Sequence, residues 1–298
     1  MNWLFYAILS PAVYTIVNFV DKYILSKHIK DYRGMSMFAA IMATIFGTLF
    51  WVINGRPSMA THDIFLIIAS GILTFSAQVL YFKALSFEET SKIMILFAIA
   101  PVITLVLSFL FLGEQIGLRQ LLGFVIIFVS VIGVSIQGQK INIKLSPALY
   151  LIILNSLLWS TGAVLFKLVI DQNSFTQVVA YESWGIGIGG MVAFLLFKGI
   201  RSSFLETLKS VRKSVVFFIF LNEGIFVVSR LLAFLAISMG PLALVSIIGN
   251  TNVFFGLIYG TILTLIWPMA FEEDISRRGL IKKAGFSLLA FLGIVLIN

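Results

Sequence analysis

Apolar runs of about 20 residues recur along the whole chain, and most of the polar connections between them are short. A helix of about 20 apolar residues is long enough to cross ~30 Å of hydrocarbon. The pattern therefore predicts an all-α membrane protein with ten transmembrane helices. We expect them near residues 3–22, 35–53, 63–85, 91–112, 118–137, 147–168, 175–197, 214–238, 242–267 and 280–297.

The longest connection, residues 198–214, is basic, and we expect a short helix there in the headgroup region. A run of small residues, GIGIGG at 185–190, favours close packing between helices over a ligand role.

Composition agrees with a membrane protein. Of the 298 residues, 60% are hydrophobic and 11% are charged, and the mean hydropathy is +1.06. A soluble domain usually carries about 25% charged residues. The chain has no cysteine, which excludes disulfides and thiol chemistry. The first apolar run begins at Trp3 without a preceding basic residue or a small-residue cleavage site, so we expect no cleaved signal peptide.

The two halves of the chain repeat one pattern. A shift of 145 residues aligns residues 8–22 with 153–167, so that Tyr14 meets Trp159 and Lys22 meets Lys167. A shift of 152 residues aligns KALS at 83–86 with LAIS at 235–238. Because five spans is an odd number, two such repeats must cross the membrane in opposite senses. We therefore predict two inverted five-helix repeats, residues 1–138 and 147–298.

Basic residues predict the orientation. Seventeen of the 21 lysines and arginines lie in or beside the odd-numbered connections, whereas Arg56, Arg119 and Lys167 mark the opposite side. Cytoplasmic connections carry the excess of Lys and Arg, so both termini are predicted outside. This bias accounts for the net charge of +8, and no nucleic-acid partner is needed.

Residues 81–134 carry a further pattern: an aromatic residue and an AL pair end one span, and a polar turn and a span with a central proline follow. LGE comes next, and a last span opens on glycine and closes on IGV. This order resembles the repeat of EamA-type carriers in the drug/metabolite transporter superfamily. The resemblance implies a ten-helix carrier with a central cavity that moves small organic solutes, often outward.

The chain departs from that family pattern in two ways. The second repeat lacks LGE after its fourth span and reads LTLIWPMAFEED, with an insertion of about ten residues. Family members usually keep both termini in the cytoplasm, whereas the charge bias predicts them outside.

Charged residues inside predicted spans are few. A charge at the bilayer centre costs about 2.5–3.5 kcal/mol on insertion scales, so it normally faces the bundle interior and has a partner. Glu223 and Arg230 lie seven residues apart, on one face of their helix, and Glu182 is a third buried charge. These charges form either a structural ion pair or a binding site. In a site, Arg230 would bind a carboxylate or phosphate, and Glu223 or Glu182 would be its counter-charge or a proton site.

Amide and aromatic side chains could line a cavity around these charges. In the repeat alignment Gln78 falls opposite Arg230, which places two hydrogen-bonding groups at equivalent depth. The alternative for each residue is a hydrogen bond between helices, worth about 0.6–2 kcal/mol. The predicted solute-binding residues are Arg230, Glu223, Glu182, Tyr14, Asn18, Gln78, Tyr81, Asn155, Trp159, Asn250 and Asn252, with Tyr181 and Trp184 nearby.

Three residues are candidates for gating. Pro101 lies within the fourth span and should kink it, either as a flexing point or as fixed shape. Lys22 and Lys167 lie at span ends, where they could reach the interface or gate the path. Glu114 of LGE is expected to close the turn between the fourth and fifth spans, as a structural residue.

The predicted function is secondary transport of small organic metabolites by alternating access, in the direction of efflux. Amino acids or related amphipathic or anionic solutes are the expected cargo. A sugar-phosphate or nucleotide-sugar exchanger and a non-transporting membrane scaffold are the alternatives. A channel is a further possibility, although no filter-like loop or ring of charges is visible. Energy would come from a proton gradient or from solute exchange. The expected partners are a small metabolite and the lipid bilayer of a plasma or inner membrane.

Enzymatic function is not expected. His28 and His62 fall in connections on opposite sides, and the sequence contains neither HExxH nor GxSxG. No P-loop is present, which argues against direct ATP use. We therefore expect no catalytic residues, no metal site and no cofactor.

Overall fold

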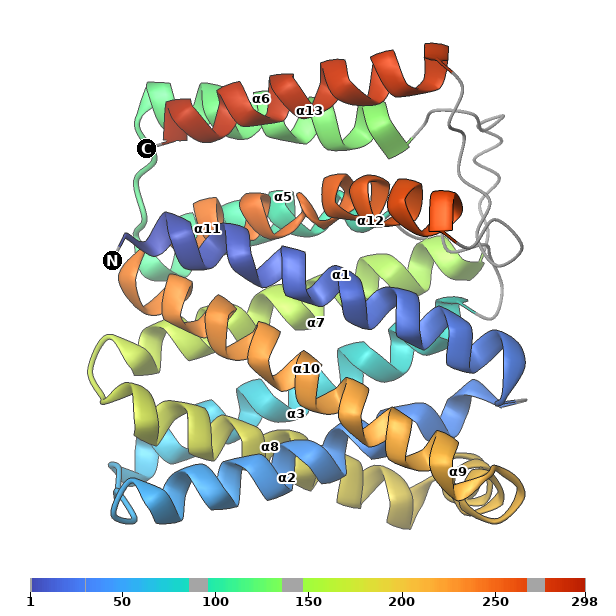
Figure 1. The fold of residues 1–298 in the computed structure, drawn as a ribbon. Coiled ribbons are helices and arrows are strands. Elements are labelled where there is room, and N and C mark those ends of the chain that lie inside the picture. The colour runs from blue at the N-terminus through green and yellow to red at the C-terminus, as the bar shows by residue number, and fades with distance from the viewer. Residues whose placement is uncertain (1, 30, 86–95, 136–146, 267–276, 298) are drawn as a thin grey trace.

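The structure is a computed structural model, and it describes residues 2–29, 31–85, 96–135, 147–266 and 277–297 (Figure 1). These residues form helices and connections and contain no strand. The helices are α1 Trp3–Lys27, α2 Met35–Ile53, α3 Thr61–Leu85, α5 Ala100–Leu107 with a π-turn at Ser108–Leu112, α6 Leu118–Ser135, α7 Pro147–Ile170, α8 Phe175–Leu196, α9 Lys198–Ser210, α10 Lys213–Met239, α11 Leu242–Gly249, α12 Asn252–Ile266 and α13 Arg277–Ile297. The predicted all-α class is confirmed.

Seven stretches within the described residues are long and apolar enough to cross a membrane. They are Trp3–Leu25, Met35–Ile53, Thr61–Ala84, Pro147–Ile170, Phe175–Leu196, Lys213–Met239 and Leu242–Ile262. Three shorter apolar helical stretches, Ala100–Leu112, Leu118–Gly133 and Ala284–Ile297, fall inside the other three predicted spans. The predicted bounds 91–112 and 118–137 extend beyond the described residues.

Helices from the two halves of the chain pack against each other in pairs. α1 packs along α10, and α7 packs along α3. α2 packs against α8, and α6 packs against α13 (Figure 1). The two chain ends lie at the same end of the bundle. Every long helix of the first half thus has a main partner from the second half.

Glycines set the distance between α3 and α8. A Cβ atom built on Gly71 would lie 2.7 Å from the Cα atom of Gly185, and a Cβ built on Gly185 would lie 2.9 Å from the Cα of Ile68. Backbones can approach this closely only where side chains are absent. The packing interpretation of the GIGIGG run is confirmed at this crossing.

Two helices expected to be continuous are interrupted. Residues 98–99 form a turn before α5, and residues 250–251 form a turn between α11 and α12. Pro101 therefore lies in the first turn of α5, where its missing N–H costs nothing, and it does not kink the middle of a helix as predicted. The expected single helix over 242–267 is likewise wrong, because the chain breaks at Asn250 and Thr251.

Glu114 was expected to close the turn between the fourth and fifth spans. Its side chain also joins the two halves of the chain. Its carboxylate accepts hydrogen bonds from the backbone N–H groups of Leu242, at 2.7 Å, and Ala243, at 3.3 Å. These donors belong to the first turn of α11, where no residue of the helix can accept from them. A carboxylate there also complements the positive end of the helix dipole.

The short basic helix expected after residue 197 is present as α9. It buries Ile200, Ser203, Phe204 and Thr207 and leaves its charged residues exposed. The Oγ of Ser203 accepts from the N–H of Gly34 at 3.0 Å and donates to the carbonyl of Asp31 at 3.1 Å. α9 is thereby tied to the connection between α1 and α2. Its place in the headgroup region stays a prediction.

The α3–α8 crossing gives a test of packing. We expect Gly71→Ala to lower the free energy of unfolding by about 1–3 kcal/mol, because the added methyl group forces the helices apart. Gly224→Ala in α10 is the matched control, since a Cβ there meets no atom within 4 Å. Thermal unfolding of the purified protein compares the two, and an equal loss in both variants would contradict the close crossing.

Candidate functional site

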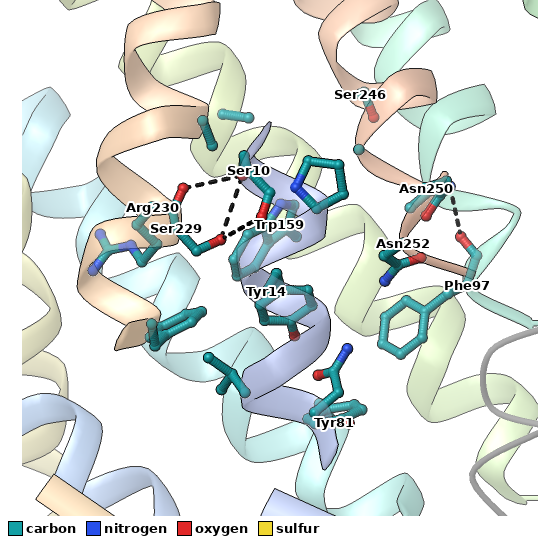
Figure 2. A pocket seen from close by; sticks show the side chains of 18 of the residues that line it. Ser10, Tyr14, Tyr81, Phe97, Trp159, Ser229, Arg230, Ser246, Asn250 and Asn252 are labelled. Atoms are coloured by element: carbon teal, nitrogen blue, oxygen red, sulfur yellow. Dashed lines mark hydrogen bonds between the residues drawn. The ribbon is translucent and has the colours of Figure 1, made fainter. Parts of the chain in front are cut away.

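A cavity of about 250 Å³ lies between the halves of the chain. Its walls come from α1, α3, α5, α7, α10 and α11, with Phe97, Asn250 and Asn252 beside the two helix breaks. Part of this lining is drawn in Figure 2. Ten predicted solute-binding residues line the cavity: Tyr14, Asn18, Gln78, Tyr81, Asn155, Trp159, Glu223, Arg230, Asn250 and Asn252. These ten residues come from α1, α3, α7, α10 and the first residue of α12, and from the turn at residues 250–251.

Aligned positions of the two halves face the same cavity. Tyr14 and Trp159, which correspond at a shift of 145 residues, both line it. Gln78 and Arg230, which correspond at a shift of 152, also both line it. α1 and α7, and likewise α3 and α10, therefore present equivalent positions to the cavity.

Arg230 is paired with Glu182 rather than with Glu223. The guanidinium of Arg230 donates a hydrogen bond to the carboxylate of Glu182, and their side chains are only 9% and 1% exposed. The guanidinium also lies over the rings of Phe226 and Phe234, 5.8 and 5.1 Å from their centroids. Figure 2 shows it pointing away from Tyr14, which lies within the cavity.

Glu182 itself does not line the cavity. It reaches Arg230 from α8, and so the ion pair joins α8 to α10 from behind the cavity wall. The sequence allowed Glu223 or Glu182 as the counter-charge, and the structure selects Glu182. Glu223 lines the cavity and is 5% exposed.

Asp21 is a cavity residue that the sequence analysis missed. It lies in α1 on the same face as Tyr14 and Asn18, at helical spacings of three, four and seven residues, and it lines the cavity. Its carboxylate accepts a hydrogen bond from the Nδ2 of Asn222, 2.8 Å away. The first span was expected to end at residue 22, one residue after Asp21. α1 instead continues for more than a turn, to Lys27.

Hydroxyl groups around the cavity tie its helices together. Ser10 and Ser229 each donate from Oγ to the other's carbonyl oxygen, at 3.0 Å, which joins α1 to α10 (Figure 2). Thr104 of α5 contacts the hydroxyls of Ser160 in α7, at 2.8 Å, and Ser246 in α11, at 3.2 Å. These small residues gave no charge or aromatic signal in the sequence.

Two predicted amide residues make hydrogen bonds between helices. The Nδ2 of Asn155 donates to the carbonyl of Ala77 at 2.5 Å. The Nδ2 of Asn250 donates to the carbonyl of Phe97 at 3.5 Å, which links the second helix break to the first (Figure 2). For these two, the structure contains the interhelical bond that was the alternative to solute binding.

The other predicted residues lie away from the cavity. The Nζ of Lys167 donates to the carbonyl of Ile237 at 3.0 Å and pairs with Asp171 at 3.0 Å, so it does not simply extend to the interface. Tyr181 and Trp184 stack edge-to-face with each other and do not line the cavity. The side chain of Lys22 lies outside the described part of the chain.

No group of three or more histidine or acidic side chains in the described ranges could hold a metal ion.

The buried ion pair gives a double-mutant prediction. Glu182→Gln and Arg230→Gln should each lower the free energy of unfolding by about 3–5 kcal/mol, because each leaves one buried charge without a partner. The double variant should lose less than the sum of the two losses. Thermal unfolding measures all three, and Glu223→Gln with Arg230→Gln is the matched control pair. Additive losses for the Glu182 pair would contradict the assignment.

The model of the EamA-like transporter family matches residues 1–136. None of the curated proteins compared matches the chain. A solved protein described as "Crystal structure of protein" matches the structure with a TM-score of 0.68 and 12% identity, over 99% of this chain and 95% of that chain. At this identity the likeness shows the fold alone. Residues 1–136, slightly less than half of the 298 residues, are therefore similar to the EamA-like transporter family, and the apolar helices of the chain indicate an integral, multi-pass membrane protein.

Proposed function

We propose that the chain is a secondary transporter in which two inverted five-helix repeats, residues 1–138 and 147–298, move a small amphipathic solute by alternating access. The observation that carries this proposal is a central cavity lined by aligned positions of both halves, beside two interrupted helices. Interrupted helices that meet at the interface of two repeats are typical of transporter binding sites.

The positions of the helix breaks support the repeat. A shift of 152 residues places Ala98 on Asn250 and Ile99 on Thr251, so the two turns coincide in the alignment. The packing is equally symmetric, since α1 with α10 corresponds to α7 with α3. The same alignment also pairs Gln78 with Arg230. The helix breaks, the helix pairs and the cavity lining therefore all support the same alignment of the two halves.

The cavity suits a solute about the size of an amino acid. Its volume of about 250 Å³ lies just below the usual range of small-molecule pockets, about 300–1,000 Å³. Its walls combine amide groups with the rings of Tyr14, Tyr81, Trp159 and Phe226. An amphipathic solute could place its apolar part on these rings and its polar groups on the amides.

Alternating access requires two arrangements of the same helices. The breaks at 98–99 and 250–251 are the points where each helix can bend, because the chain there already leaves regular helix geometry. A proton gradient or exchange of solutes would supply the energy. The proposed direction of net movement is outward, as the family resemblance implies.

The alternative of a phosphorylated solute has less support. Among the described side chains, Arg230 is the one cation that lines the cavity, and Glu182 already pairs with it. A phosphate would have to compete with that carboxylate.

Counterflow in proteoliposomes tests the transport function. We expect uptake of labelled amino acids and amines to saturate and to be accelerated by unlabelled solute on the opposite side. Trp159→Ala should weaken apparent affinity about tenfold, equivalent to ~1.4 kcal/mol, because it removes a ring from the cavity wall. Phe217→Ala is the control, since that ring is 71% exposed on α10 and does not line the cavity.

The alternatives give different results in the same assay. Flux without saturation or counterflow would indicate a channel, and no flux of any solute would indicate a scaffold.

A further inference from the structure

We infer that the cavity selects solutes that carry a positively charged amine, with Asp21 and Glu223 as the counter-charges for that group. This inference rests on the proposed transport function and names the chemical class of its solute. It replaces the expectation from sequence that Arg230 captures an anionic group.

The cavity wall carries charged side chains of both signs. Its charged lining residues, among those described, are Asp21, Glu223 and Arg230. The positive charge of Arg230 is offset by Glu182, which stands behind the wall. No ion pair in the described ranges joins Asp21 or Glu223 to a basic side chain. The cavity wall therefore holds two acidic groups that form no ion pair with a described basic side chain, although the charge of Arg230 also acts on Glu223.

The two carboxyl groups lie on neighbouring helices. Asp21 is on α1 and Glu223 is on α10, and these two helices pack along each other. Both acids line the cavity together with Tyr14. Asn222, which precedes Glu223 on α10, donates to Asp21 at 2.8 Å. One stretch of the α1–α10 wall thus holds both acids.

Two carboxylates in one wall are costly. Two like charges in a small, weakly solvated cavity repel each other, and each loses hydration that it had in water. Either protons or a bound cation relieves this cost. An ammonium group does so while donating N–H bonds to the carboxylates, which are shorter and stronger than bonds between neutral groups. A solute whose one charged group is a carboxylate would add a third like charge.

Aromatic rings line the same cavity. The rings of Tyr14, Tyr81, Trp159 and Phe226 lie around the same space as the two acids. Aromatic faces attract cations, most strongly where water is excluded. The rings also accept an apolar skeleton. The wall therefore favours an amine attached to an aromatic or aliphatic group.

Binding to the unmodified full chain is the first test. We would measure the affinities of tyramine, N-acetyltyramine and 4-hydroxyphenylpropionate for the purified protein at one pH, together with the aliphatic pair hexylamine and N-hexylacetamide. Each amine should bind at least tenfold more tightly than its uncharged acetyl derivative, and tyramine should also bind at least tenfold more tightly than the carboxylic acid. Equal binding within both amine pairs, or no binding by either amine, would overturn the inference.

Variants then assign the effect to the two acids. Asp21→Asn and Glu223→Gln keep nearly the same shape and should each weaken tyramine at least tenfold, with little change for N-acetyltyramine. Glu206→Gln is the matched control, because this exposed carboxylate of α9 does not line the cavity. An equal loss for tyramine and its acetyl derivative would mean that the variants disturb the cavity rather than its charge. That result would contradict the assigned role.

Flux separates this inference from the proposed function. If tyramine binds selectively but no solute crosses proteoliposomes, transport is wrong and the amine site stands. If proteoliposomes show saturable flux of neutral or anionic solutes and the amine is not preferred, transport stands and the amine site is wrong.

Discussion

The ion pair between Arg230 and Glu182 decides the chemistry of the cavity. It places the charge of Arg230 against a carboxylate that stands outside the cavity, and it joins α8 to α10 at the same point. A charge this deep must have a partner, because its desolvation is costly. Because that partner is Glu182, Arg230 forms no ion pair with Glu223, and the cavity wall holds the carboxyl groups of Asp21 and Glu223 in addition. The proposed preference for amines follows from this pairing.

Backbone hydrogen bonding imposes the second constraint. In hydrocarbon, a backbone group without a partner is costly, so helix breaks occur where protein or a polar cavity can satisfy them. Both breaks here lie beside the cavity, and the amide of Asn250 reaches the carbonyl of Phe97 across them. Glu114 satisfies the first N–H groups of α11 from the opposite half of the chain. Both helix breaks thus lie where the two halves meet.

Glycines and small hydroxyl residues shape the rest of the bundle. Gly71 and Gly185 bring the backbones of α3 and α8 together, and Ser10 with Ser229 joins α1 to α10. Such residues bury little apolar area. In a membrane this costs little stability, because lipid is as apolar as the helix surface. Close approach and hydrogen bonds hold the helices instead, and the aromatic residues remain free to line the cavity.

The helical class and the approximate bounds of the spans follow from the sequence, because apolar length is a local property. The face shared by Tyr14, Asn18 and Asp21 is also local, although an early end assigned to the first span hid Asp21. Helix breaks within long apolar runs, the partner of Arg230 and the reach of Glu114 to α11 are different. They depend on which helices become neighbours in the folded chain. Glu182 and Arg230 are 48 positions apart in the sequence, and Glu114 and Leu242 are 128 positions apart. Only tertiary packing decides those contacts, since several carboxylates in the sequence could serve one arginine and depth alone does not choose among them.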